Sequence, residues 1–450
     1  MTDASSRVIR IGCGAGFSGD RIEPAVELAE RGNLDYLIFE CLAERTIALA
    51  QKAKLDDPQL GYDPLLLERL GAVLPACVAN RVKIVSNMGG ANPLSAARRT
   101  VELARALGFV GLTIAAVEGD DITALLRSPD VDLLQSDGSA LKVNPSDMIS
   151  ANVYLGGGPV RDALRLGADI VLTGRVADPA LFLGPLMHEF DWAEDDWAHL
   201  GRATLVGHLL ECAGQLTGGY FADPGMKDVA GLARLGFPLA EVHADGRVIL
   251  TKLAGTGGVV SIATCKEQLL YELQDPAAYL TPDVVADFSG VTFQQVAADR
   301  VHAGGARGHA RPETLKVSIG YQDGFIGEGQ ISYAGTGALD RARLALRIVE
   351  ERLKLTGVSL RESRYDLIGV DSICGDSQGV VIPREIRIRV AGRTRTLAEA
   401  VRVGREVEAL YTNGPAGGGG VTRSATAVIA IASALIPRRH VTPRIRLELA

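Results

Sequence analysis

Short apolar runs alternate with amphipathic stretches from Val8 to about Met187. Runs rich in Val, Ile and Leu are typical of buried strands, and the stretches between them have helical periodicity. We expect strands at Val8–Cys13, Leu34–Phe39, Val82–Ser86, Phe109–Val117, Ala151–Leu155 and Ala168–Leu172, and helices at Ile22–Arg31, Ala43–Lys52, Pro64–Ala79, from Ser95, and at Val160–Leu166. This alternation predicts an α/β fold with a parallel, doubly wound sheet, although a partial barrel would also fit.

The pattern changes after about Pro238, where strands follow one another with turn residues between them. The segment E-V-H-A-D-G-R-V-I-L-T-K indicates a hairpin with Asp245–Gly246 as its turn. Further strands are expected at Val291–Val296, Thr314–Tyr321, Gln330–Tyr333, Asp366–Val370 and Glu385–Val390, helices at Asp191–Gly219, Arg341–Leu355, from Leu397 and at Val421–Ile436, and a loop or hairpin at Asp130–Lys142. We therefore expect an α/β domain at residues 1–230 and an α+β lobe at residues 231–450.

Polar residues and glycines follow several predicted strands at their carboxyl ends. Because these ends share one edge of a parallel sheet, where α/β proteins bind ligands, we expect the residues to open on one cleft. The candidate substrate-binding residues along this edge are Gly16, Arg21, Asn87, Gly89, Gly90, Asn92, Tyr154, Arg175 and Asp178. An Arg175–Asp178 ion pair that fixes the loop, and Asn residues that only form turns, are the structural alternatives.

Gly14, Gly16 and Gly19 have the spacing G-x-G-x-x-G between a predicted strand and helix. Such a turn can bind a dinucleotide, and Glu40 stands where an acid would bind the ribose. However, Asp20 places a carboxylate where the phosphate would lie, and an acid there is more simply a helix cap. A nicotinamide-dependent oxidoreductase therefore stays as an alternative function.

Four residues are candidates for proton transfer: Asp20, Glu40, His208 and Glu211. Glu40 or Asp20 would be the base and His208 the acid, with Asn87 and Asn92 as donors to an oxyanion. The spacing H-x-x-E-C at His208 is not that of a zinc site, because no second pair of ligands exists, so no metal is expected.

The stretch T-N-G-P-A-G-G-G-G-V-T-R-S precedes a predicted helix and is typical of an anion-binding loop. Its candidate contacts are Asn413, Gly414, Gly418 and Arg423, and a coenzyme A phosphate or a substrate carboxylate would suit them. We expect this loop to close the cleft from the second lobe, the alternative being a flexible connection.

Composition narrows the class of protein. A net charge of −7 and 5% aromatic residues argue against a nucleic-acid partner. The start M-T-D-A-S-S has no features of a leader, the apolar run Ala425–Leu435 is too short to span a membrane, and the six cysteines are scattered. A cytoplasmic protein without a membrane partner is therefore expected.

Several segments together resemble the acyclic terpene utilisation protein AtuA family: G-A-G-F-S-G-D-R, L-D-Y-L-I-F-E-C-L-A-E, N-M-G-G-A-N-P, A-N-V-Y-L-G, G-A-D-I-V-L-T-G-R-V-A-D, G-H-L-L-E-C-A-G-Q-L-T-G-G, K-L-A-G-T-G-G-V-V-S and T-N-G-P-A-G-G-G-G. The resemblance extends over nearly the whole chain. It implies an enzyme of carboxylic-acid or acyl-CoA catabolism, with lyase or hydratase chemistry on a branched hydroxyacyl-CoA, and no cofactor other than coenzyme A as part of the substrate.

Some members of that family carry a small ferredoxin-like C-terminal domain, which we do not expect in this chain. A separate ferredoxin-like subunit is therefore a candidate partner, alongside a small anionic substrate. A non-catalytic subunit for such a partner is the third possible function, and a homo-oligomer is expected.

Overall fold

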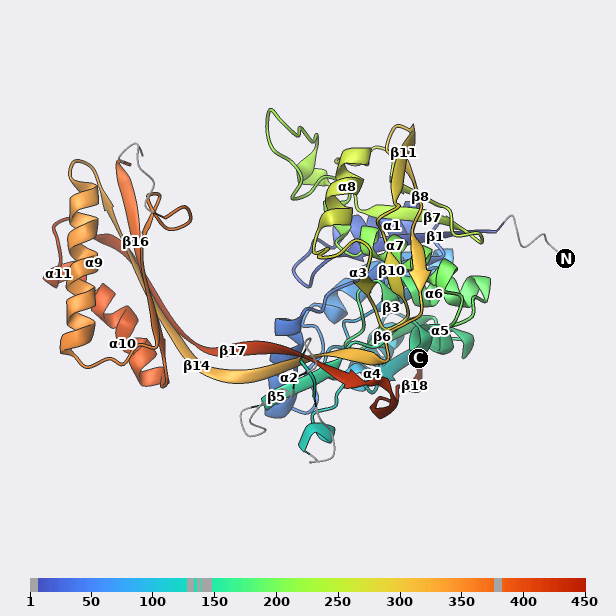
Figure 1. Cartoon of the computed structure of the whole chain (residues 1–450), viewed down its shortest axis with the longest axis horizontal. Coiled ribbons are helices and arrows are strands. Elements are labelled where there is room, and N and C mark those ends of the chain that lie inside the picture. Colours follow the sequence, from blue (N-terminus) through green and yellow to red (C-terminus); the bar gives the residue numbers. More distant parts are fainter. Residues whose placement is uncertain (1–6, 128–132, 136–138, 140–147, 376–382) are drawn as a thin grey trace. The chain divides into compact units, whose positions relative to one another are not determined.

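The computed structural model describes residues 7–127, 133–135, 139, 148–375 and 383–450 (Figure 1). Most of the predicted loop or hairpin at Asp130–Lys142 lies outside these residues. The chain forms two compact units, Met1–Gly320 with Ile431–Ala450, and Tyr321–Ala430. Residues 231–320, which we expected in the second lobe, thus belong to the first unit.

The first unit is built on a ten-stranded mixed sheet. Its strands, in spatial order, are β11 (Thr292–Ala297), β12 (Arg300–Gly304), β8 (Val248–Lys252), β7 (Pro238–His243), β1 (Val8–Ala15), β2 (Tyr36–Phe39), β3 (Lys83–Ser86), β6 (Ile170–Thr173), β4 (Thr113–Glu118) and β18 (Arg444–Leu449). The five central strands, β1, β2, β3, β6 and β4, pair in parallel, and the strands on either side of them pair antiparallel. The predicted α/β class is therefore confirmed.

Helices cover both faces of the parallel strands, which is why those strands are continuous apolar runs. Two groups of helices form these covers. In the first group α3 packs against both of its neighbours: α1 (Glu23–Arg31), α3 (Leu66–Asn80) and α4 (Pro93–Ala106). In the second group α6 packs against both of its neighbours: α5 (Gly158–Arg165), α6 (Ala180–Phe190) and α7 (Trp197–Leu210). The remaining helices of this unit are α2 (Glu44–Asp56) and α8 (Ile262–Leu270). The chain runs from β3 through α4 to β4 and returns through α5 to β6, which pairs between β3 and β4.

The predicted hairpin is confirmed among the antiparallel strands of the sheet: β7 pairs with β8, and Gly246 takes a φ of +78° in the turn between them. A separate small sheet consists of β9 (Tyr279–Leu280), β10 (Val285–Asp287) and β13 (Arg307–His309). Among the described residues, no helix has both the length and the apolar character that crossing a membrane requires.

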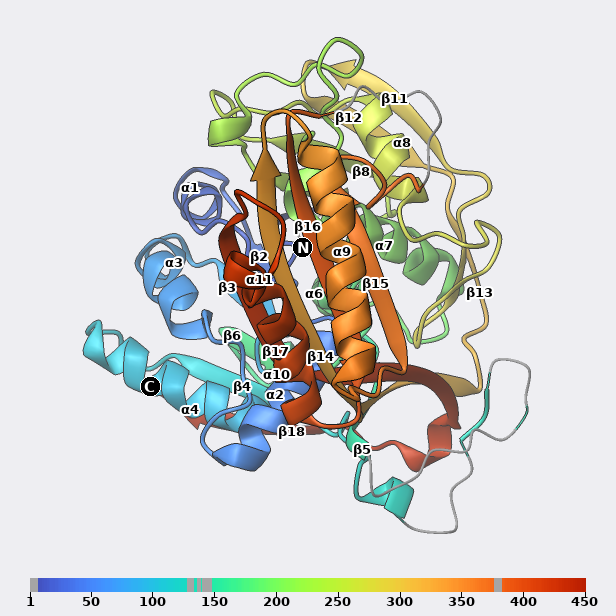
Figure 2. The same ribbon diagram turned by 90° about the vertical axis from the view of Figure 1, so that its left-hand side faces the viewer.

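The second unit has the element order βαββαβ: β14 (Thr314–Ala334), α9 (Ala338–Leu355), β15 (Glu362–Ile368), β16 (Glu385–Thr394), α10 (Leu397–Glu408) and β17 (Gly419–Pro437), with the short α11 (Leu410–Asn413) before β17. The first residues of β14 and the last residues of β17 belong to the first unit. The strand order is β15-β16-β14-β17, and β16 pairs antiparallel with both of its neighbours. This is the split-βαβ, ferredoxin-like arrangement. Figure 2 shows α9 and α10 on one face of the sheet.

One predicted element of this half is wrong, and two predicted strands form a single strand. The strands expected at Thr314–Tyr321 and Gln330–Tyr333 are parts of the single strand β14, and the helix expected at Val421–Ile436 is the strand β17. The alanines of the latter segment favour a helix, but its Val, Thr and Ile residues favour a strand. Pairing with β14 supplies the backbone hydrogen bonds that decide between them.

Candidate functional site

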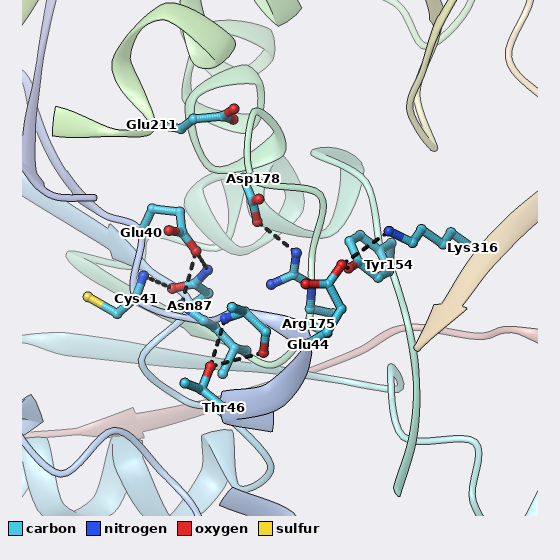
Figure 3. Close-up of polar contacts among 12 residues, drawn as sticks. Glu40, Cys41, Glu44, Thr46, Asn87, Tyr154, Arg175, Asp178, Glu211 and Lys316 are labelled. Carbon is cyan, nitrogen blue, oxygen red and sulfur yellow. Dashed lines mark hydrogen bonds and ion pairs between the residues drawn. The ribbon is translucent and has the colours of Figure 1, made fainter. Parts of the chain in front are cut away.

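The carboxyl ends of the parallel strands meet at one edge, as predicted. β1, β2, β3 and β6 are neighbours in the sheet, so Glu40, Asn87 and Arg175, which follow three of them, come together. Figure 3 shows these residues with Glu44, Tyr154, Asp178, Glu211 and Lys316. We call the four side chains Glu40, Arg175, Asp178 and Glu211 the carboxyl cluster.

Asn87 holds Glu40 in place. Asn87 Nδ2 donates to Glu40 Oε1 at 2.8 Å, and the Leu42 backbone N–H donates to the same oxygen at 2.9 Å. Asn87 Oδ1 accepts from the Cys41 N–H at 2.7 Å, so both ends of the Asn87 amide are engaged within the protein. Burial, and then the negative charge of Asp178, raise the pKa of Glu40 well above its ordinary value.

Arg175 is the cation of the cluster, and its side chain is only 2% exposed. Its Nη2 donates to Asp178 Oδ1 at 3.0 Å, and its guanidinium lies 4.1 Å from the centre of the Tyr154 ring. Within the described part of the chain, Nε and Nη1 of Arg175 are buried without a hydrogen-bond partner. Buried N–H groups are rarely left unpaired, so these two donors are suited to an anionic group of a ligand.

A second set of contacts positions the ring beneath Arg175. The Tyr154 hydroxyl donates to Glu44 Oε1, and Lys316 Nζ donates to the same oxygen at 3.1 Å. Lys316 Nζ also lies 4.6 Å from the centre of the Tyr154 ring. Although burial opposes ionisation, the hydrogen bond from Tyr154 and the charge of Arg175 lower the pKa of Glu44 to about 2, so Glu44 is a fixed anion.

His208 and Glu211 form a buried pair, with His208 Nδ1 3.0 Å from Glu211 Oε1. His208 Nε2 lies 3.0 Å from the carbonyl oxygen of Leu269, which can only accept, so Nε2 carries the hydrogen. Since both ring nitrogens are engaged within the protein, the structure places His208 where it holds Glu211 rather than where it meets a substrate.

Glu211 has one oxygen left for chemistry, because its Oε2 is buried without a partner among the described residues. Burial raises the pKa of Glu211 to about 7, against the opposing effect of the His208 hydrogen bond. A carboxyl group that titrates near neutral pH can both take up and release a proton under physiological conditions.

The glycine turn after β1 is occupied by the protein itself. Asp20 Oδ2 accepts from the Gly16 N–H at 3.0 Å, where a dinucleotide phosphate would bind. A side chain at Gly16 would meet the carbonyl carbon of Cys212 at 2.5 Å, so this glycine is needed for packing. Arg21 donates to the carbonyl oxygen of Leu232 at 3.1 Å and so fixes a neighbouring loop.

The residues after β3 other than Asn87 are also used structurally. Asn92 caps α4 by accepting from the Ser95 N–H at 3.4 Å, and its Nδ2 donates to the Leu60 carbonyl at 2.8 Å. The structure therefore does not offer Asn92 as an oxyanion donor. A side chain at Gly89 would meet the Thr173 carbonyl oxygen at 2.5 Å, and Gly90 takes a φ of +55°.

The glycine loop of the second unit leads into a strand, so the helix N-terminus expected beside it is absent there. Arg423 pairs with Glu408 at 3.0 Å, and Asn413 Nδ2 donates to the Ala409 carbonyl at 3.1 Å. A side chain at Gly418 would lie 3.2 Å from Tyr333, and one at Gly414 2.7 Å from the Leu410 carbonyl oxygen. Closure of the cleft by this loop stays a prediction.

Sequence reasoning missed Glu44, Lys316 and Asp120. Glu44 has a detectable signal, since it follows Glu40 by four residues at the predicted ligand-binding edge. Asp120 follows β4 and accepts from the Arg175 N–H at 2.9 Å and from Asn152 Nδ2 at 2.8 Å. Lys316 comes from the distant strand β14, and no local pattern marks it. In the described ranges, no group of three or more His, Cys, Asp and Glu side chains could hold a metal ion.

The chain belongs to the family described as Acyclic terpene utilisation family protein AtuA, whose model matches residues 9–447. The resemblance seen in the sequence motifs is thereby confirmed. Comparison with curated proteins and with solved structures gives no match.

Proposed function

We propose that this AtuA-family protein is an enzyme that transfers protons next to a carbonyl group, and so adds or eliminates water or cleaves a carbon–carbon bond in a carboxylic acid or its coenzyme A thioester. The family description points to a role in the use of acyclic terpenes. The observation that carries the proposal is that Glu211 Oε2 and Arg175 Nε and Nη1 are buried without partners among the described residues, and that Asp178 acts on both side chains.

Arg175 supplies the electrostatic part of the proposed reaction. Its two unpaired N–H groups would bind the carboxylate, or the carbonyl oxygen of a thioester, on which negative charge develops when the adjacent carbon loses a proton. Asp178 and the Tyr154 ring hold the guanidinium, so little reorganisation is needed when the charge appears. A buried cation of this kind interacts more strongly than one in water.

The two glutamates would divide the proton transfers. Glu211, with a pKa of about 7, removes the proton from the carbon next to the carbonyl, and the electrons of that C–H bond form the new double bond. Glu40, whose pKa is raised by burial, donates a proton to the departing hydroxyl group, and water leaves. Hydration is the reverse of these steps, and solvent restores both protonation states.

The test is exchange of the proton next to the carbonyl in D2O, followed by mass spectrometry on 3-hydroxyacyl-CoA thioesters, enoyl-CoA thioesters and the corresponding free acids. We expect exchange with the native protein and a loss of about 10²- to 10⁴-fold in Glu211→Gln, the usual contribution of a general base. Glu102→Gln is the matched control, because Glu102 is 60% exposed on α4. Native exchange rates in Glu211→Gln would refute the assignment of the base.

The oxyanion role of Arg175 is tested separately by Arg175→Lys, which keeps the charge but loses the planar pair of donors. We expect a lower rate of exchange with substrate affinity reduced less. The nicotinamide alternative has its own readout: stabilisation of the protein by NAD or NADP, with none by coenzyme A thioesters, would favour an oxidoreductase over the function proposed.

A further inference from the structure

A pocket of about 350 Å³ lies in the first unit, apart from the carboxyl cluster. Its walls come from the loop after β5 (Met148–Val153), from the start of β14 and from the segment before β18. Six apolar residues line it: Leu155, Pro159, Leu315, Val441, Pro443 and Ile445. Its polar side is formed by Asp162, Glu194, Asp283, Arg311 and Arg438.

The acidic side chains of this pocket already have partners within the protein. Glu194 Oε1 accepts from Arg161 at 2.8 Å and its Oε2 from Arg311 at 3.1 Å. Asp162 pairs with Arg161 at 2.8 Å. Both oxygens of Asp283 accept from the Gly157 N–H at 3.0 Å. The charges of Asp162 and Glu194 are therefore balanced by arginines, whereas Asp283 is held by a backbone N–H.

Arg438 differs from the other cations of the pocket. Its Nη2 donates to the carbonyl oxygens of Pro282 and Pro312, and no ion pair joins it to an acid of the described chain. Its Nε is buried without a hydrogen-bond partner among those residues. Burial and the nearby charge of Arg311 lower the pKa of Arg438, even though Asp283 and Glu194 oppose this effect. Among the described residues, no carboxylate therefore pairs directly with this guanidinium, although Asp283, Glu313 and Glu194 act on it from beyond ion-pair distance.

We infer that the pocket binds a small organic monocarboxylate with a short hydrocarbon body, whose carboxylate meets Arg438 and whose body contacts the apolar walls. The unpaired Nε, on a guanidinium without an ion pair among the described residues, is suited to an anion. The six apolar residues favour a ligand with a hydrocarbon part over inorganic phosphate. A volume of about 350 Å³ admits only a small molecule.

This site is distinct from the one used in the proposed function. The two share a backbone wall, since the Leu155 N–H donates to the Arg175 carbonyl at 3.2 Å, but no side chain of the carboxyl cluster lines the pocket. Binding at Arg438 can therefore be present or absent whatever the fate of the reaction proposed for Glu40 and Glu211.

Hexanoate is a suitable probe, measured by isothermal titration calorimetry and by the shift in melting temperature. Acetate lacks the hydrocarbon body, hexan-1-ol lacks the charge, and inorganic phosphate carries negative charge but has no hydrocarbon body. We expect hexanoate to bind more tightly than all three. Arg438→Gln should weaken hexanoate binding by about ten- to hundredfold, the worth of a hydrogen bond to a charged group. Arg439→Gln is the control, because Arg439 is an exposed neighbour.

A second variant guards against a folding defect in Arg438→Gln, which also loses two bonds to backbone carbonyls. Val441→Phe should fill the pocket, leave Arg438 in place and abolish binding. Equal affinity for hexanoate in the native protein, Arg438→Gln and Val441→Phe would place the ligand elsewhere, at Arg175 for example, and would overturn the inference. Binding of phosphate as tight as that of hexanoate would overturn the ligand class.

Discussion

Replacing Asp178 with Ala tests how the carboxyl cluster is held together. Arg175 Nη2 lies 3.0 Å from Asp178 Oδ1, and the Arg175 side chain is 2% exposed, so water cannot solvate its charge once the partner is gone. Removing one partner of a buried ion pair costs about 3–5 kcal/mol of unfolding free energy. Because the Asp178 side chain is itself 32% exposed, water can enter in its place, and we expect the lower end, about 3 kcal/mol.

Two further variants separate the charge from the hydrogen bond. Asp178→Asn keeps an oxygen acceptor for Arg175 and loses only the charge, so its cost should be about half as large, roughly 1.5 kcal/mol. Asp162→Ala is the control, since Asp162 also pairs with an arginine, but its side chain is 47% exposed. Exposed ion pairs contribute about 0–1 kcal/mol, and this variant should stay in that range.

The assay is urea unfolding followed by tryptophan fluorescence. Both tryptophans, Trp192 and Trp197, belong to the first unit, so the signal reports the unit that contains Asp178. Free energies follow from linear extrapolation at neutral pH. If Asp178→Ala and Asp162→Ala lose the same free energy within about 0.5 kcal/mol, Arg175 does not depend on its buried partner, and the reasoning from burial fails.

Two other predictions concern stability. The pKa of Glu211 rises from its ordinary value of 4.5 to about 7 in the folded protein. Between these two pH values the native state therefore binds more protons than the unfolded state. The free energy of unfolding should consequently fall as the pH rises through this range. Urea unfolding at a series of pH values should show a shallower fall in Glu211→Gln; parallel curves for the two proteins would contradict this. Gly16→Ala should lower the free energy of unfolding by about 1–3 kcal/mol, because its methyl group would stand 2.5 Å from the Cys212 backbone. Gly71 lies inside α3, and a methyl group there would be 3.8 Å from its nearest neighbour, so Gly71→Ala should be neutral or stabilising by up to about 1 kcal/mol. Equal melting temperatures for the two glycine variants would show that the turn after β1 can adjust.

The parallel core of the fold could be predicted from the sequence because its signals are local. β2, β3 and β6 are four-residue strands that are covered on both faces, so each is a short apolar run between helical patterns. The segment of β17 carries two conflicting local signals, alanines for a helix and β-branched residues for a strand. Its long partner β14, which is over 80 residues earlier in the chain, settles the conflict, and no window of sequence contains both.

The position of the candidate site at the edge of the sheet could also be predicted from the sequence, because Glu40, Asn87 and Arg175 each follow a predicted strand. Their roles did not follow. Asn87 was expected to face a substrate oxyanion, yet its amide is bound to Glu40 Oε1 and to the Cys41 N–H. Whether a polar atom is free or engaged depends on what the rest of the fold brings to it.

Asp20 and Glu211 show how this difference bears on function. Asp20 sits in the most recognisable motif of the chain, but its carboxylate accepts from the N–H groups of Gly16 and Arg21, so the motif binds its own acid. Glu211 sits in the stretch G-H-L-L-E-C, which has no standard metal or nucleotide spacing, and a histidine on the same helical turn engages one of its oxygens while burial raises its pKa. An acid with one oxygen held and the other unpaired is oriented for proton transfer, and an acid with both oxygens bound to backbone N–H groups is a structural cap. The chemistry of this protein is therefore to be sought at Glu211 and Arg175 before the glycine turn.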